Sequence, residues 1–178
     1  MKGNRKIIIL AGATNSGKTT TSLQIAKQLF DVKIFHYDSE FKKNLKQKKI
    51  RHIFLEVNQR ILFDLQKTEN EIIIYEGCQL ILISLLEEIY ISCSSFMKIY
   101  LVLFDMPFNV LIYRAIQRAT SRRLLFEKIA SLVITYILLK WNKKLIYQWA
   151  NDKKIDVITI QNAVQFSVSD FVTSNFLS

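Results

Sequence analysis

Two glycines and a lysine near the N-terminus constrain the fold of this chain more than any other feature. A short apolar run, residues 7–10, leads to Gly12, and Gly17, Lys18 and Thr19 follow after four intervening residues. A loop with this spacing can turn successive backbone N–H groups towards a phosphate chain, because glycine leaves room and tolerates unusual dihedral angles. Apolar positions with helical spacing follow Lys18, and the N-terminal end of such a helix attracts the same anion.

The loop therefore predicts a nucleotide phosphate site in which each polar residue has a role. Lys18 would supply a mobile charge to the β and γ phosphates, and the Thr19 hydroxyl would be a ligand for Mg²⁺. The alternative is a strand–helix turn without a ligand, but the strand pattern before the loop and the helix pattern after it favour the nucleotide site. The residues expected to contact the nucleotide are Gly12, Ala13, Thr14, Asn15, Ser16, Gly17, Lys18, Thr19 and Thr20.

Short β-branched runs alternate with helical patterns along the 178 residues. The expected strands are 6–10, 32–37, 71–75, 99–104 and 155–160, and the expected helices are 18–30, 56–67, 79–91, 107–118, one or two within 124–150, and 163–176. Several strands are apolar almost throughout, as is typical when helices cover both faces of a parallel sheet. The sequence thus predicts an α/β fold, a single domain over 1–178, with a doubly wound, mainly parallel five-stranded sheet.

An acidic residue follows three of the predicted strands: Asp38, Glu76 and Asp105. Ligands in such sheets bind at the carboxyl ends of the strands. We expect Asp38 and Glu76 to serve Mg²⁺, and Asp38 to orient or deprotonate a hydroxyl acceptor. The alternatives are a helix N-cap for Asp38 and a loop acid near Lys18 for Glu76. For Asp105 we favour capping of the helix that starts near Pro107.

Four arginines lie close together in the segment that would follow the fourth strand: Arg114, Arg118, Arg122 and Arg123. Arg114 and Arg118 are four residues apart, so they share a helix face. Such a row can hold a transferring phosphoryl group and offset its charge, and we expect a phosphate-binding lid over about 114–124. The alternative is a basic, solvated helix end.

The formal charge of +10 favours anionic ligands. The segment 42–51 holds six Lys or Arg in ten residues and no aromatic residue. A solvated face is the favoured interpretation of this segment, and contact with RNA or a membrane is the alternative. Nucleic acid is therefore a partner that we consider but do not favour.

Two further features concern the compartment and the assembly. Cys78 and Cys93 form neither a zinc-site nor a disulfide pattern, so we expect reduced thiols and a cytoplasmic location. The apolar run before the loop has only four consecutive residues, so we expect no signal peptide. The longest apolar run, 129–139, is too short to span a bilayer and predicts a buried core helix; for its aliphatic part, 132–139, a homodimer interface is the alternative.

The stretches "GATNSGKTT", "YDSEF", "YEGCQLIL" and "DMPFNVLIYRAIQRATSRR" together resemble the P-loop kinases of the uridine kinase, phosphoribulokinase and nicotinamide riboside kinase group. "IYQWANDKKIDVITI" is similar to the family's segment before its last strand, so the resemblance covers about residues 6–160. It implies an ATP- and Mg²⁺-dependent kinase acting on a nucleoside or related ribosyl compound. Its implied site residues are Lys18, Thr19, Asp38, Glu76, Arg114, Arg118 and Arg123: the phosphate lysine, the Mg²⁺ hydroxyl, the general base near the metal, the Mg²⁺ glutamate and three phosphate arginines.

The chain departs from that family after the second strand. Its element reads Asp38-Ser39-Glu40-Phe41, one residue longer than the family's Asp-Ser-Phe, and the insertion that holds a nucleoside base is missing. The acceptor therefore stays open between a nucleoside-like hydroxyl compound and a nucleoside monophosphate. A nucleotide-dependent switch with an RNA or protein partner is the alternative of another class; no Asn-Lys-x-Asp element is present, which argues against a GTPase.

Overall fold

The computed structural model describes residues 5–38, 67–95, 97–161 and 166–176, together with helical positions 56, 59, 62, 63 and 65. Its centre is a five-stranded sheet in the order β2-β3-β1-β4-β5, in which every neighbouring pair is parallel. The strands are β1 (Arg5–Gly12), β2 (Val32–His36), β3 (Ile72–Gly77), β4 (Met97–Phe104) and β5 (Val157–Ile160). The predicted α/β class and the five parallel strands are confirmed.

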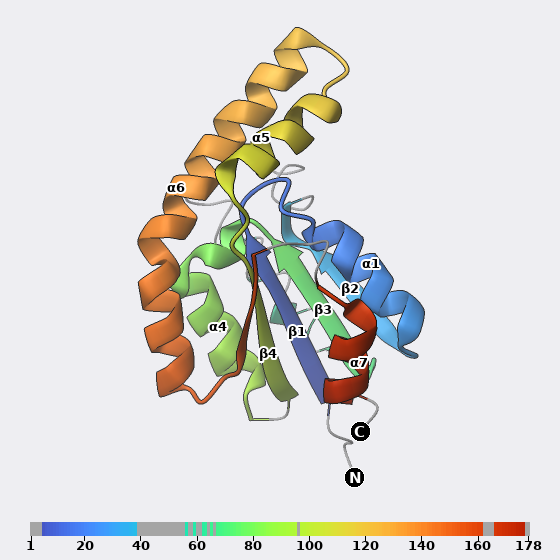
Figure 1. Cartoon of the computed structure of the whole chain (residues 1–178). Coiled ribbons are helices and arrows are strands. Elements are labelled where there is room, and N and C mark those ends of the chain that lie inside the picture. Colours follow the sequence, from blue (N-terminus) through green and yellow to red (C-terminus); the bar gives the residue numbers. More distant parts are fainter. Residues whose placement is uncertain are drawn as a thin grey trace.

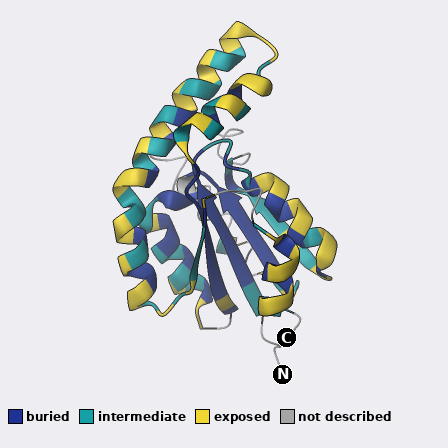
Figure 2. Ribbon diagram, in the orientation of Figure 1, coloured by how far each residue is buried: buried dark blue, intermediate teal, exposed yellow. Residues whose placement is uncertain are grey.

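Helices cover both faces of this sheet (Figure 1). Helix α1 (Lys18–Gln28) and helix α7 (Val168–Phe176) lie on one face, and helix α4 (Ile83–Cys93) and helix α6 (Arg122–Asp152) lie on the other. A short 3-10 helix, η1 (Gln79–Ile81), follows β3. The central strands β1 and β4 are buried over their last six residues (Figure 2), and this is why the sequence shows continuous apolar runs there.

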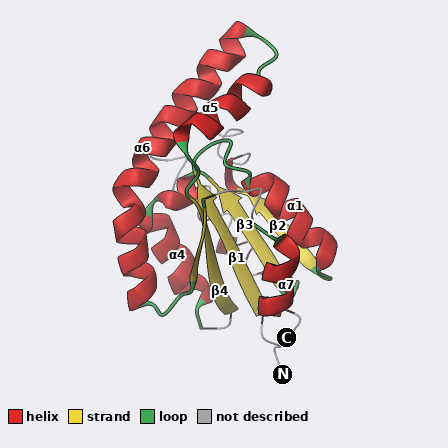
Figure 3. Cartoon of the chain, in the orientation of Figure 1, coloured by secondary structure: helices red, strands yellow, loops and turns green. Residues whose placement is uncertain are grey.

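Helix α5 (Phe108–Gln117) and α6 form a hairpin that extends beyond the carboxyl ends of the strands (Figure 1). The sequence left one or two helices open within 124–150, and the structure has a single helix of 31 residues, about 46 Å long. Figure 3 shows the loop that joins the two helices at the far tip. The predicted lid, 114–124, therefore corresponds to the end of α5, this turn and the start of α6.

The apolar run 129–139 lies within α6, and the prediction that it is a buried core helix is wrong in part. Leu132, Thr135 and Leu139 are buried, whereas Ile134 and Ile137 are exposed. One face of the helix packs on the core and the opposite face is open, because α6 is the outermost layer on this side of the sheet (Figure 2).

Asp105 does not cap a helix, contrary to the expectation from the sequence. Helix α5 begins after Pro107 without a side-chain cap. The buried carboxylate of Asp105 instead accepts hydrogen bonds from Lys140 at 2.7 Å and Lys143 at 2.5 Å, both on α6. Burial would raise the pKa of Asp105, but these two lysines outweigh it and hold the pKa below its ordinary value. The contact ties the long helix to the end of β4.

We predict that Asp105→Asn lowers the free energy of unfolding by about 2 kcal/mol at pH 7, because both lysines lose a charged acceptor. A carboxyl whose pKa is lower in the folded chain stabilises the fold above its unfolded pKa, near 4, and loses this effect as the pH falls through the folded pKa. Denaturant unfolding of both proteins should therefore show a difference near neutral pH that shrinks below about pH 4. Equal stability at pH 7 would contradict the assigned role.

Some expectations fall outside the described residues. The basic segment 42–51 and the continuation of the "YDSEF" element after Asp38 are among them. The described positions between 56 and 67 are all helical, as expected. Of the helices in the part of the chain that the structure describes, none is both long enough and apolar enough to cross a membrane.

Candidate nucleotide and acceptor site

The loop between β1 and α1 has the backbone of a phosphate-binding loop. Gly12 and Gly17 have φ angles of 155° and 106°, and Asn15 has a φ of 64°. A Cβ at Gly12 would lie 2.7 Å from the Cβ of Phe104, so no larger residue fits there. The first turn of α1 contains no acidic residue and no side chain caps it, so its free N–H groups are open to an anion.

Lys18 lies inside this loop. Its Nζ donates to the carbonyl oxygens of Gly12 at 3.0 Å and Ala13 at 2.9 Å, and the residue is almost fully buried. The structure therefore places the lysine charge at the centre of the loop. Nζ also lies 3.4 Å from the Ser16 hydroxyl, and a buried ammonium with these neutral partners is well suited to exchange them for phosphate oxygens.

Glu76 is held at the end of β3 by three side chains. Oε1 accepts hydrogen bonds from Thr19 Oγ1 at 2.9 Å and from His36 Nδ1 at 2.5 Å, and Oε2 accepts one from Ser22 Oγ at 3.1 Å. In the sheet register, His36 on β2 stands beside Glu76, which explains the short contact. The carboxylate is thereby fixed next to the first turn of α1.

The oxygens of Thr19 and Glu76 fit a magnesium ion whose remaining ligands are phosphate oxygens and waters. The Thr19 hydroxyl and the Glu76 carboxylate are adjacent hard oxygen donors, and Mg²⁺ in nucleotide sites needs only one or two protein ligands. Within the described residues, no group of three or more His, Cys, Asp or Glu could hold a metal alone. The geometry thus supports Thr19 and Glu76 as a pair and leaves a metal role for Asp38 as a prediction.

Asp38 is anchored between the ends of two strands. Its Oδ1 accepts the backbone N–H of Cys78 at 2.8 Å. Gly77 makes this approach possible, since a Cβ there would lie 2.8 Å from the Cβ of Tyr37 and 3.0 Å from Oδ1 of Asp38. The carboxylate is therefore fixed on one oxygen at the edge of the sheet that carries the loop.

The arginines fall into two groups. Arg114 donates from Nη1 to the carbonyl oxygens of Asn15 at 3.3 Å and Ser16 at 3.1 Å, and Nη1 of Arg118 lies 3.5 Å from Oδ1 of Asn15. Burial, and then the nearby charge of Arg118, lower the pKa of Arg114. Two cations that repel each other beside the loop favour an anion between them.

Arg123 is not at the loop. Its side chain is 91% exposed and pairs with Glu127 on the same helix at 3.2 Å. The structure therefore brings Arg114 and Arg118 together but leaves Arg123 at the tip of the hairpin, and its predicted phosphate role stays a prediction.

A cavity of about 430 Å³ lies above the loop. The residues that line it are Thr14, Asn15, Ser16, Gly17, Lys18, Thr19, Thr20, Asp38 and Arg118. Among the described residues, Nδ2 of Asn15 is the one buried side-chain polar atom without a hydrogen-bond partner. An unpaired donor in a cationic loop fits a phosphate oxygen, so the residues present fit a nucleoside triphosphate.

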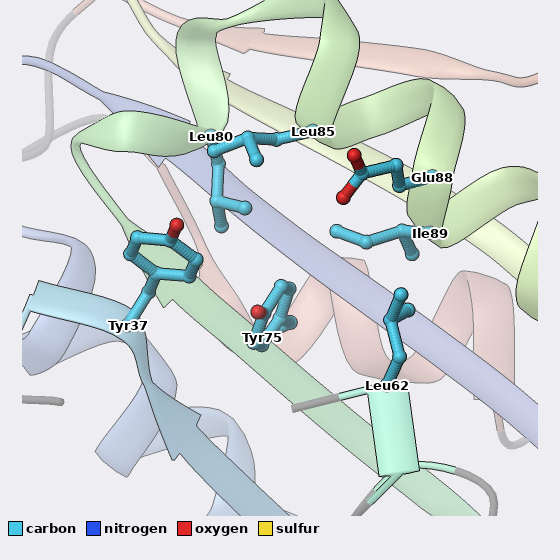
Figure 4. Close-up of a pocket in the computed structure, with 7 residues that line it drawn as sticks. All are labelled: Tyr37, Leu62, Tyr75, Leu80, Leu85, Glu88 and Ile89. Atoms are coloured by element: carbon cyan, nitrogen blue, oxygen red, sulfur yellow. The ribbon is translucent and has the colours of Figure 1, made fainter. Parts of the chain in front are cut away.

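A second, much smaller pocket lies between the sheet and α4 (Figure 4). It encloses about 10 Å³, space for one water. The residues that line it are Tyr37, Tyr75, Glu88, Leu62, Leu80, Leu85 and Ile89 (Figure 4). Burial, and in second place the charge of Glu88, raise the pKa of Tyr37 well above its ordinary value, so its hydroxyl keeps its proton. At this volume the pocket is too small to hold a substrate.

Several functional contacts were not predicted from the sequence. His36 and Ser22 hold Glu76, and Thr135 and Ser131 on α6 contact the loop at Thr14. The signal for the last pair was two small hydroxyl residues, four apart, inside an otherwise mostly apolar run. His36 could be found only through the β2–β3 register.

Strand order, the glycine-containing loop after the central strand and the arginines beside that loop together make up a parallel α/β fold with a phosphate-binding loop at the carboxyl ends of its strands.

Comparison with solved structures agrees with this fold. The chain aligns with a chain of the Pnkp1/Rnl/Hen1 RNA repair complex at 19% identity and a TM-score of 0.57, over 92% of its own length and 50% of that chain. A gluconokinase from Sinorhizobium meliloti 1021 aligns at 13% identity and a TM-score of 0.54, over 94% of this chain and 87% of the gluconokinase. Deoxyadenosine kinase from M. mycoides, with bound dATP, aligns at 16% identity and a TM-score of 0.57, over 97% of this chain and 100% of that kinase.

These likenesses establish the fold. This chain spans half the length of the RNA repair chain that it matches. Neither a protein-family model nor a curated protein matches the sequence. The P-loop kinase fold expected from the resemblance is confirmed, while the uridine kinase subgroup is not.

Proposed function

We propose that this chain is an ATP- and Mg²⁺-dependent kinase that transfers the γ-phosphoryl group to a hydroxyl of a small molecule. The observation that carries the proposal is the composition of the large cavity. Lys18 and Thr19, which suit the phosphates of a donor, line the same cavity as Asp38, which suits a hydroxyl acceptor. A binding module or switch needs Lys18 and Thr19 to hold the phosphates, but it does not need the Asp38 carboxylate, because it has no acceptor hydroxyl to activate.

Each residue has a definite task in this reaction. The loop N–H groups, the start of α1 and Lys18 hold the β and γ phosphates. Thr19 and Glu76 would hold Mg²⁺, which offsets the charge on those phosphates. Asp38 orients the acceptor hydroxyl and takes its proton as the oxygen attacks phosphorus. Arg118 and Arg114 stabilise the negative charge on the transferred group.

The acceptor that we propose first is a nucleoside or related ribosyl metabolite. The resemblance at the strand ends supports it, and a deoxyadenosine kinase is among the structural neighbours. A nucleoside monophosphate is the second acceptor to test, because Arg114 and Arg118 could serve an anionic acceptor. The neighbour in an RNA repair complex makes RNA a further candidate acceptor for the same assay.

The test is ATP consumption with Mg²⁺ against nucleosides, nucleoside monophosphates, sugars and sugar acids, and 5′-hydroxyl oligonucleotides. The proposal expects one class of hydroxyl acceptor to raise turnover well above the rate without acceptor. Stimulation by monophosphates alone would replace it with a nucleotide kinase. ATP binding without stimulation by any acceptor would favour a switch.

We also propose that the chain is a single domain and that it is cytoplasmic. A separate proposal is that it forms a homodimer through α6. The open face of α6 carries Phe126 and Trp141, 76% and 74% exposed, together with Ile134. In an antiparallel pair centred near residue 135, the bulky Trp141 of one copy meets the small Ala130 of the other, so the face is self-complementary. We predict a dimeric mass by light scattering and a monomeric mass for Trp141→Glu; a monomeric parent chain would contradict this.

A further inference from the structure

The inner face of α6 carries two hydroxyl residues one turn apart, Ser131 and Thr135, within the run 129–139. Thr135 is buried, with 9% of its surface exposed. Both hydroxyls face Thr14 in the phosphate-binding loop, more than 115 positions earlier in the sequence. Neither is needed for the helix itself, and neither belongs to the residues assigned to nucleotide, metal or acceptor.

The contact with Thr14 uses the loop's own backbone. Its N–H donates to Oγ1 of Thr135 at 3.1 Å, and its side-chain hydroxyl lies 3.3 Å from Oγ of Ser131. The hydroxyl of Thr135 has the carbonyl oxygens of Ser131 at 2.9 Å and Leu132 at 3.2 Å as acceptors for its one proton, and its Oγ1 accepts the loop N–H. One amide of the loop is thus bound by the helix instead of being turned to a ligand.

The other helix of the hairpin binds the next two residues of the loop. Arg114 on α5 donates to the carbonyl oxygens of Asn15 and Ser16. Residues 14–16 are therefore held by α6 through an N–H and by α5 through two C=O groups. Asn15 in their midst has a left-handed φ of 64°, a conformation that needs support from its surroundings.

We propose that Ser131 and Thr135 are positioning residues for the nucleotide-binding loop, and that through them the α5–α6 hairpin sets the affinity of the loop for phosphates. The proposal rests on the proposed function in that the ligand is a nucleotide. The physical reason is preorganisation: a loop that already has its binding shape loses less conformational freedom when the phosphates arrive.

The test compares four variants. Thr135→Val keeps the shape and removes the acceptor, Thr135→Ser keeps the acceptor, and Ser131→Ala removes only the contact with the Thr14 hydroxyl. Lys140→Met is the matched control, because it loosens the same helix at its contact with Asp105 without touching the loop. Amide hydrogen exchange of the peptide around residues 13–17 is measured without nucleotide, and the Kd for MgATP is measured by titration.

For Thr135→Val we expect exchange about fivefold faster and a Kd about fivefold weaker, the effect of one hydrogen bond. Thr135→Ser and Lys140→Met should match the parent in both readouts, and Ser131→Ala should show a smaller change. Unchanged exchange and Kd in Thr135→Val, or an equal change in Lys140→Met, would overturn the positioning role. A parent chain that binds no MgATP would instead overturn the proposed function, and the exchange data would separate the two failures.

Discussion

Replacing Lys18 with alanine should abolish MgATP binding at millimolar concentrations and lower kcat/KM by about 10³-fold, or about 4 kcal/mol of transition-state stabilisation. The reason is the position of the ammonium at the centre of the loop, where the partners of its Nζ among the described residues are two carbonyl oxygens and the Ser16 hydroxyl. Phosphate oxygens are its natural substitutes, and no other described lysine lines the cavity. Titration calorimetry and initial rates measure both effects.

Lys27→Ala is the matched control for this experiment. Lys27 lies on the same helix and carries the same charge, but it is exposed and distant from the loop. It should leave binding and rate within about twofold of the parent, since solvated charges on a helix surface contribute little. If both variants bind MgATP as the parent does, the loop is not the nucleotide site.

Asp38→Asn should lower kcat by about 10²- to 10⁴-fold and leave the KM for ATP nearly unchanged. Asparagine has the same shape, and its Oδ1 can still accept the N–H of Cys78, so the ends of β2 and β3 stay joined. The amide cannot take a proton from the acceptor. A loss in kcat alone is the signature of a group that acts in the transition state.

A thermal unfolding midpoint within a few degrees of the parent is the control for this variant, because the anchoring hydrogen bond is retained. If kcat falls less than about threefold, Asp38 is a structural link between two strands and not the base. If the KM for ATP rises in parallel with the fall in kcat, the residue serves nucleotide binding.

The sequence was sufficient for the parts of this structure that depend on local pattern. The loop could be predicted because its glycines are needed for backbone geometry, which Gly12 and Gly17 bear out with their positive φ angles. The convergence of Asp38 and Glu76 at one sheet edge follows from parallel strands, whatever their lateral order. The first prediction depends on residues that are adjacent in sequence, and the second depends only on the common direction of parallel strands.

Contacts between distant segments could not be predicted in this way. Asp105 follows a strand and precedes Pro107, so the sequence favoured a helix cap. In the structure its carboxylate instead forms ion pairs with two lysines of α6. The pairing of His36 with Glu76 depends on which strands are neighbours and in which register. From its sequence neighbours alone, Thr135 resembles a core residue, and only the fold shows that it accepts a hydrogen bond from Thr14.

The most direct test of the central claim is to follow the γ-phosphoryl group itself. The purified chain is incubated with γ-labelled ATP, Mg²⁺ and the hydroxyl acceptor that most increases ATP consumption, beside Asp38→Asn. The account predicts label in a phosphate ester of that acceptor, formed at the rate of ATP loss and nearly absent with the variant. Label that stays in ATP, or that is found only in inorganic phosphate, would contradict a kinase.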